Sequence, residues 1–160
     1  VYKITIDANG DISSVIDKQN ANKEILKSPI RLALLYNEPC FWASWEIAYK
    51  TVTNEPRAYV DGTPEISIVE DGPVRISLKV TRTKENSTYV QYIKLTDSDT
   101  KRRIDVENEV DWKTSKTLLK AVSDENYALF DIDNIGKDES TGVGIYGVKA
   151  PRNKIQIIEG

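Results

Sequence analysis

Residues 65–95, EISIVEDGPVRISLKVTRTKENSTYVQYIKL, decide the fold class. Apolar residues alternate with polar ones from Val74 to Thr81, after the turn sequence Asp71-Gly72-Pro73. A polar turn follows, and residues 88–95 are again rich in β-branched and aromatic side chains. Alternation with a period of two is typical of strands that bury one face. The stretch therefore predicts antiparallel strands joined by short turns.

The same pattern extends to both sides of this stretch. Residues 2–6 and 12–16 flank Asn9-Gly10, which is the strongest short signal for a β-hairpin. Residues 30–36 are apolar enough to be buried on both faces, and residues 104–112 alternate. Short strands with frequent turns are typical of sandwiches. We predict an all-β fold, a partial antiparallel β-sandwich, as a single domain over residues 1–160.

Three segments are less decisive. Residues 20–26 are compatible with one helical turn, and residues 115–122 with either a helix or a strand. The tail from Ser123 onward is acidic and contains glycine, and its periodicity is weaker. Gly142, Gly144 and Gly147 match a dinucleotide-binding pattern there. That pattern lacks the preceding buried strand and the following helix, so a turn or bulge is favoured.

Charge and hydropathy exclude two classes of partner. The chain has 160 residues, a net charge of −3 and a pI near 5.1. Nucleic-acid binders usually carry a basic stripe, so we expect no nucleic acid as a partner. No apolar run approaches the ~18 residues of a membrane span, and no signal peptide is apparent, so we expect no membrane partner.

Missing residue types narrow the chemistry further. The sequence has no His, which excludes a Ser-His-Asp triad, a Cys-His dyad and a His-ligated zinc site in this chain. Its one Cys excludes an internal disulfide and is compatible with a cytoplasm or a bacterial periplasm, so the compartment stays open. The absence of Met and the start at Val1 predict a piece of a longer protein.

An acidic row is the first candidate site. Asp105, Glu107, Glu109 and Asp111 occupy alternate positions and share one face of a strand, with neighbouring carboxylates roughly 6.5–7 Å apart. An inverting glycosidase pair needs about 6.5–9.5 Å, and Ca²⁺ also takes such ligands. We favour a solvated face on which cations from neighbouring strands answer the acids. Those cations would be Arg75, Lys79 and Lys94.

An aromatic cluster is the second candidate. Trp42 and Trp45 lie three positions apart, Glu46 follows directly, and Tyr36 and Tyr49 lie nearby in the sequence. Sugar rings stack on aromatic faces while carboxylates accept bonds from their hydroxyl groups. The alternative is that these aromatic side chains plug one end of the core. We predict Trp42, Trp45 and Glu46 as substrate-binding residues, with no catalytic and no metal-binding residue in this chain.

Several phrases resemble one family, glycoside hydrolase family 38, the α-mannosidases. The phrase NGDISSVIDK (residues 9–18) is similar to the opening of the family's C-terminal β-domain. WASWE (42–46) and DGPVR (71–75) also resemble it, and the closest similarity lies in VENEVDW (106–112) followed by TLLKAV (117–122). The resemblance covers about residues 2–122, and leaves 123–160 without an assignment.

The resemblance implies a galactose-mutarotase-like supersandwich behind a separate catalytic domain. That domain would hold zinc through His and Asp and would use an Asp nucleophile to hydrolyse α-mannosides with retention. This chain lacks His, so it is expected to be a non-catalytic part with no cofactor of its own. Its partners would be the parent's catalytic domain and α-mannosides. The alternatives are a free-standing carbohydrate-binding module and a structural or adhesion β-sandwich.

Overall fold

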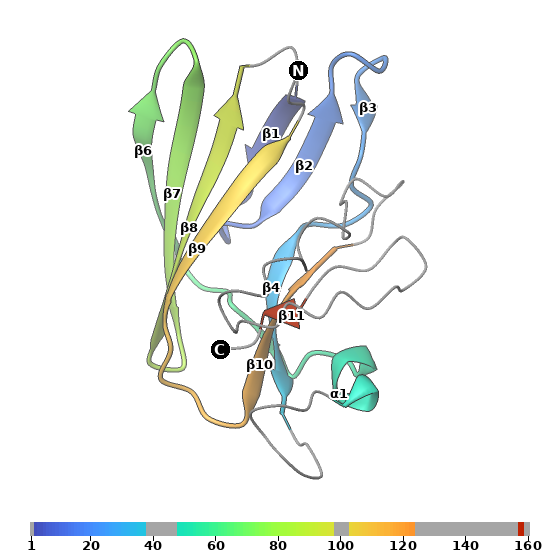
Figure 1. The fold of residues 1–160 in the computed structure, drawn as a ribbon, viewed down its shortest axis with the longest axis vertical. Helices are drawn as coiled ribbons and strands as arrows, with labels where there is room; N and C mark the ends of the chain where they lie inside the picture. The colour runs from blue at the N-terminus through green and yellow to red at the C-terminus, as the bar shows by residue number, and fades with distance from the viewer. Residues whose placement is uncertain (1, 38–47, 98–102, 124–156, 159–160) are drawn as a thin grey trace, which may run out of the picture. The chain divides into compact units, whose positions relative to one another are not determined.

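The computed structural model describes residues 2–37, 48–97, 103–123 and 157–158. These residues are almost entirely β-structure (Figure 1). The elements are β1 (Tyr2–Ile6), β2 (Ile12–Asp17), β3 (Lys23–Glu24), β4 (Arg31–Tyr36), α1 (Tyr49–Thr53), β5 (Ala58–Tyr59), β6 (Glu65–Asp71), β7 (Arg75–Lys84), β8 (Ser87–Thr96), β9 (Ile104–Asp111), β10 (Thr117–Val122) and β11 (Ile157–Ile158).

The strands form three antiparallel sheets in two compact units. The first unit comprises residues 1–25 and 61–114, and contains sheets of order β1-β2-β3 and β6-β7-β8-β9. The second unit comprises residues 26–60 and 115–160, and contains the sheet β11-β10-β4-β5. The predicted all-β class with antiparallel strands is confirmed.

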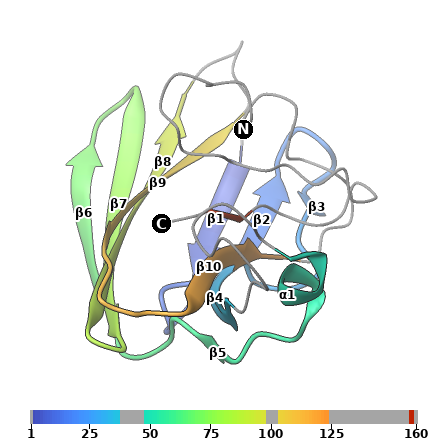
Figure 2. The same cartoon turned by 60° about the horizontal axis from the view of Figure 1, so that its bottom comes forward.

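The four-stranded sheet is a meander in which each strand pairs with the next along the chain (Figure 2). β7 and β8 pair along their whole length, from Arg75 opposite Thr96 to Lys84 opposite Ser87. Glu85 and Asn86 connect them with φ of 52° and 62°. Positive φ at both central residues is the signature of the tight hairpin turn whose twist suits the flanking strands.

The turn between β1 and β2 lies against the inner strand β7 within the first unit. Gly10 turns the β1–β2 hairpin with φ +81°, and a Cβ built there would lie 2.7 Å from Val80 Cγ1. The next residue, Asp11, accepts a hydrogen bond from Arg82 Nη1 at 2.6 Å. Glycine therefore serves both the backbone conformation and the close approach of the two sheets. The first unit is a partial β-sandwich.

The second unit is built around β4. Leu32, Ala33, Leu34 and Leu35 are all buried, so both faces of this strand are covered, as its apolar sequence predicts. β10 pairs with it from Thr117 opposite Tyr36 onward. Ala33 and Leu35 form a core with Leu118, against which Tyr59 and Val122 pack. Residues 115–122, which left helix and strand open, thus contribute a strand.

The structure departs from the sequence-based expectation in two segments. Residues 20–26 contain no helical turn: Ala21 and Asn22 have positive φ, and the short strand β3 follows. The helix α1 was not predicted, and its five residues are too few for periodicity to reveal it. No helix in the described part of the chain has the length and apolarity needed to cross a membrane.

The alternation in β7 also overstates burial. Val80 is fully buried, but Val74 and Ile76 are exposed although they share its period. The pattern identifies the apolar face of the strand correctly. Whether a second layer covers that face depends on contacts from elsewhere in the chain.

Candidate functional site

Trp42, Trp45 and Glu46 lie outside the described residues, so their placement as a sugar site stays a prediction. In the sequence they lie between β4, which ends at Tyr36, and α1, which begins at Tyr49. Both tyrosines are exposed, with 62% and 72% of their surface accessible. These two members of the aromatic cluster therefore do not plug a core.

The exposed ring of Tyr36 is in a cation–π contact with Arg57. The guanidinium of Arg57 lies 5.4 Å from the centre of the Tyr36 ring, and its Nη2 donates to Thr117 Oγ1 at 2.9 Å. Asn37 continues from Tyr36, and its backbone N–H donates to the Lys116 carbonyl. An exposed ring held by a cation is a surface on which a sugar can stack.

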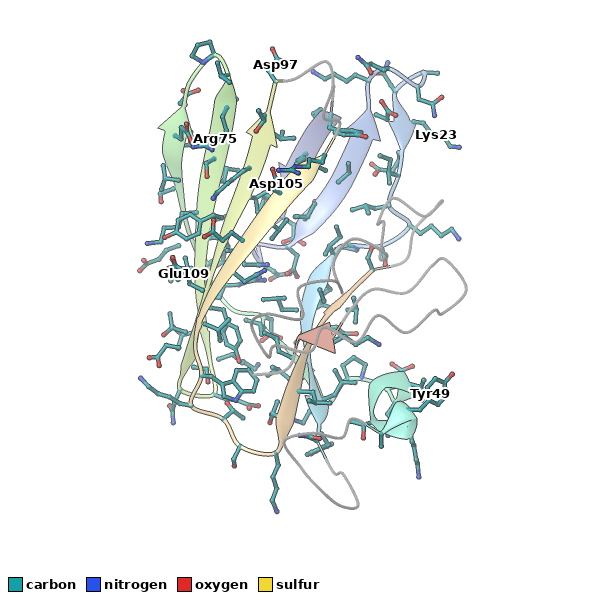
Figure 3. The ribbon with its side chains drawn as sticks, viewed as in Figure 1. Lys23, Tyr49, Arg75, Asp97, Asp105 and Glu109 are labelled. Carbon is teal, nitrogen blue, oxygen red and sulfur yellow. The ribbon has the colours of Figure 1, made fainter. Side chains whose placement is uncertain are left out.

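The acidic row lies on β9 as predicted, and most of it is neutralised. Arg103 Nε is 2.8 Å from Asp105 Oδ1, and Lys113 Nζ is 2.7 Å from Asp111 Oδ2. Lys94, on the neighbouring strand β8, forms an ion pair with Glu107. Glu109, which is labelled in Figure 3, is exposed. In the pairing of β8 with β9 it lies opposite Val90. Carboxylates paired with surface cations are typical of a solvated face.

The cations expected opposite this row are distributed as follows. Lys79 and Lys94 both approach the Tyr92 ring, at 5.9 Å and 5.8 Å from its centre. Arg75 instead pairs with Glu70 on β6 at 2.6 Å, and this hydrogen bond and the charge of Glu70 raise the pKa of the Arg75 guanidinium. Lys94 therefore pairs with an acid of the row, as the charged-face interpretation predicts. Arg75 pairs with Glu70, which is not part of the row.

The Ca²⁺ interpretation of the row needs several acidic ligands that converge. No such group of three or more His, Cys, Asp or Glu side chains occurs among the residues the structure describes. The row is extended along the strand, and three of its members already bind cationic side chains. The alternation that makes these residues share a face also keeps them apart.

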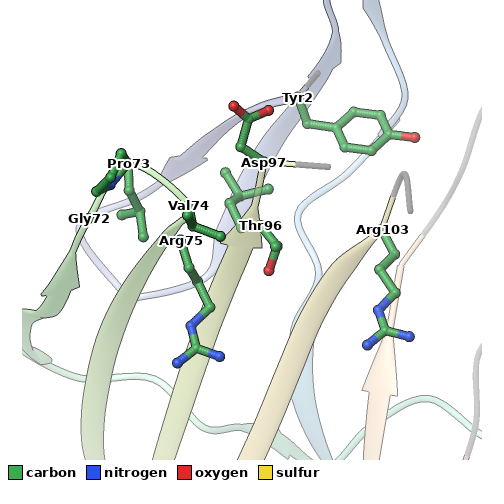
Figure 4. A pocket seen from close by; sticks show the side chains of 10 residues that line it. Tyr2, Gly72, Pro73, Val74, Arg75, Thr96, Asp97 and Arg103 are labelled. Atoms are coloured by element: carbon green, nitrogen blue, oxygen red, sulfur yellow. The ribbon is translucent and has the colours of Figure 1, made fainter. Parts of the chain in front are cut away.

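A shallow pocket of about 270 Å³ lies at one end of the first unit (Figure 4). Ile76 and Leu95 contribute apolar surface, and Tyr2, Asp97 and Arg103 contribute polar groups. In Figure 4 the Arg103 guanidinium extends along the sheet, away from the Asp97 carboxylate. The charged groups therefore do not converge on a common point, as a binding site requires.

Sequence reasoning also missed a buried ion pair between Arg82 and Asp11. Both side chains are at most 2% exposed, and Arg82 also donates to Gln91 and to the Asn9 carbonyl. The signal was present: Arg82 follows Ile76, Leu78 and Val80 at a position where the period predicts an apolar residue. A cation at a core position indicates a buried partner. The pair joins the two sheets and is structural.

Comparison with known proteins identifies the family of this chain. The sequence model of the C-terminal domain of family 38 glycosyl hydrolases matches residues 1–129. The class defined by fold and sequence is thus a glycoside hydrolase-associated β-domain. The chain belongs to the family 38 C-terminal domains. A search of curated proteins finds no match.

The zinc implied by the family resemblance does not fit this chain. That metal takes His and Asp ligands, and the sequence contains no His. The described acidic residues do not gather into a substitute site. No reaction step is therefore assigned to zinc in residues 1–160.

Proposed function

We propose that this chain is the non-catalytic β-domain of an α-mannosidase, and that it supports a separate catalytic domain of the parent protein. The observation that carries the proposal is the family match over residues 1–129. Two features support it. The chain has no His that could bind the family's zinc, and three of the four carboxylates in the acidic row form ion pairs with cationic side chains. The parent would hydrolyse α-mannosides with retention.

Its supporting role requires surface that a neighbouring domain can cover. Exposed large apolar side chains outside the edge strand β6 also occur in the first unit: Val106 and Val110 on β9, and Val74 just before β7. Contacts of such residues with another domain bury apolar area and stabilise both partners. Because binding to the folded state raises stability by mass action, the effect is measurable on the catalytic domain.

The experiment combines the chain with a separately expressed catalytic domain of a family 38 α-mannosidase. We expect the temperature of half-inactivation of mannosidase activity to rise as the chain is added. The control is the Asp11→Ala variant, which loses a buried ion-pair partner and should stabilise less. An unchanged inactivation temperature at saturating chain would refute the supporting role.

A second candidate role, favoured by the exposed Tyr36 and its Arg57 partner, is direct contact with the mannoside. Trp42, Trp45 and Glu46 follow Tyr36 in sequence and would complete a stacking surface with a hydrogen-bond acceptor. Titration with mannose or a mannan fragment should change tryptophan fluorescence. Trp42→Phe or Trp45→Phe should remove that change, whereas Trp112→Phe should leave it. A change that depends on Trp112 alone would contradict this role.

A further inference from the structure

In the part of the chain that the structure describes, the strand β6 is an open edge of its sheet. It is the outer strand of the four-stranded sheet, and no strand among the described residues pairs with its free side. All of its residues except Glu70 are exposed, and the central run Ile66–Val69 carries no charge. Edge strands present unpaired N–H and C=O groups, which natural proteins usually protect with charges, bulges or covering segments.

An apolar strip lies beside this edge. Ile66 is opposite Val80 and Ile68 is opposite Leu78, so both isoleucines are on the face that carries Val80. Ile76, on β7, continues that face, because it alternates with Leu78 and Val80. The three isoleucines are 45%, 63% and 46% exposed. The edge therefore offers backbone hydrogen-bonding groups together with apolar area.

The other edge of the same sheet is protected. β9 carries a carboxylate at every second position, and three of these carboxylates hold cations in ion pairs. Charged edge residues disfavour pairing with another chain. On β6 the charged residues stand only near the two ends of the strand, and a register shift between Ile68 and Glu70 leaves Glu65–Ile68 in regular pairing with β7. Only one of the two edges is therefore suited to receive a strand.

Charge indicates what kind of strand β6 receives. Glu65 begins the strand and Asp71 ends it, and both are exposed. Two copies of β6 paired antiparallel would bring the acidic ends of one strand against those of the other, which is unfavourable. A strand with Lys or Arg near these ends and apolar residues between them would be complementary.

We propose that β6 is a docking edge for an extended segment of a partner protein chain. The segment adds one strand to the sheet, covers Ile66, Ile68 and Ile76 with its apolar side chains, and places basic side chains beside Glu65 and Asp71. This is the mode of recognition known as β-strand addition, in which backbone bonds give affinity and alternate side chains give specificity. The inference rests on the geometry of β6 and is independent of the proposed function.

The test uses the whole chain, isotopically labelled for NMR, with two synthetic peptides as probes. In one peptide valine alternates with lysine, and in the other valine alternates with glutamate. We expect the lysine peptide to slow amide hydrogen exchange in Glu65–Ile68 and to bind more tightly than the glutamate peptide. Protection that maps to β9, equal binding of both peptides, or absence of binding would overturn the proposal.

Matched substitutions on β6 and β9 test whether the peptide binds at the β6 edge or elsewhere on the sheet. Ile68→Thr should weaken binding of the lysine peptide about tenfold, because it removes most of one apolar contact. Val110→Thr makes a similar change on β9 and should leave binding unchanged. Glu65→Lys should weaken binding roughly two- to fivefold, as expected for an exposed charge pair, and Glu109→Lys should not. Self-association of the chain through β6 would contradict the assigned partner.

Discussion

One face of the four-stranded sheet has a covered centre and an uncovered strip. In the centre, Val80, Tyr89 and Ile93 are buried, as is the Arg82–Asp11 pair. In the strip, Ile66 and Ile68 have the same chemistry and the same alternation, yet they are largely exposed. The centre is covered where the β1–β2 hairpin approaches β7. Amphipathic alternation thus defines a face, and long-range contacts decide which part of that face is core.

The largest effect is expected from Asp11→Ala. Removal of the carboxylate leaves the Arg82 guanidinium buried without its charge partner, which should cost about 3–5 kcal/mol of unfolding free energy. Urea denaturation monitored by tryptophan fluorescence measures the loss. The double variant Asp11→Ala/Arg82→Met should recover much of it, since the buried charge is gone. A loss below about 1 kcal/mol for Asp11→Ala would mean that the pair is solvated.

The same substitution in the two regions tests the comparison itself. Ile93→Ala removes a buried side chain and should lower the unfolding free energy by about 2–5 kcal/mol. Ile68→Ala removes an exposed side chain and should change it by no more than about 0.5 kcal/mol. Equal losses in both variants would show that the strip is as covered as the centre.

Gly10→Ala probes the approach of the two sheets. The new methyl group would meet Val80 Cγ1 at 2.7 Å and Pro64 Cβ at 3.0 Å, at a positive φ that alanine disfavours. We expect a loss of about 1–3 kcal/mol, measured by thermal unfolding. The same change at Gly62, which also has positive φ but no atom within 4 Å of a built Cβ, separates strain from steric overlap. An unaltered melting temperature for Gly10→Ala would argue against close contact.

The acidic row should give the smallest effects. Glu107→Gln breaks the pair with Lys94 on an exposed surface and should cost about 0.2–1 kcal/mol, decreasing at high salt. Glu109→Gln removes a carboxylate with no ion pair among the described residues, and should stay within about 0.5 kcal/mol of the parent chain. Denaturation at low and high salt distinguishes them. A stability loss of several kcal/mol in either variant would refute the solvated-face interpretation.

Local patterns were sufficient to predict most strands of this fold. The Asn9-Gly10 hairpin, the buried strand around Leu34 and the strand of the acidic row all follow from period and turn chemistry. The ion pair of Arg82 could be suspected from a charge at an apolar position, but its partner lies 71 residues away in sequence. The exposure of Ile76 and Ile68 was not predictable, because alternation contains no information about which layer covers a face.

The candidate sites were predictable to different degrees. The sequence identified the acids of β9 and the favoured charged-face interpretation, but not which cation pairs with which acid, because surface ion pairs depend on side-chain reach and register. It also did not reveal that Arg57 lies over Tyr36, since the two meet only when β5, which Arg57 precedes, pairs with β4. The roles of Trp42, Trp45 and Glu46 remain predictions.

We propose that mannoside cleavage takes place in a domain other than this one. The most direct measurement is turnover of an aryl α-mannoside by the purified 160-residue chain, with and without added zinc. We expect no release of the aryl group above the buffer rate in either condition. Release that follows chain concentration and is abolished by Glu107→Gln or Glu109→Gln would contradict it, and would restore the acidic row as a catalytic pair.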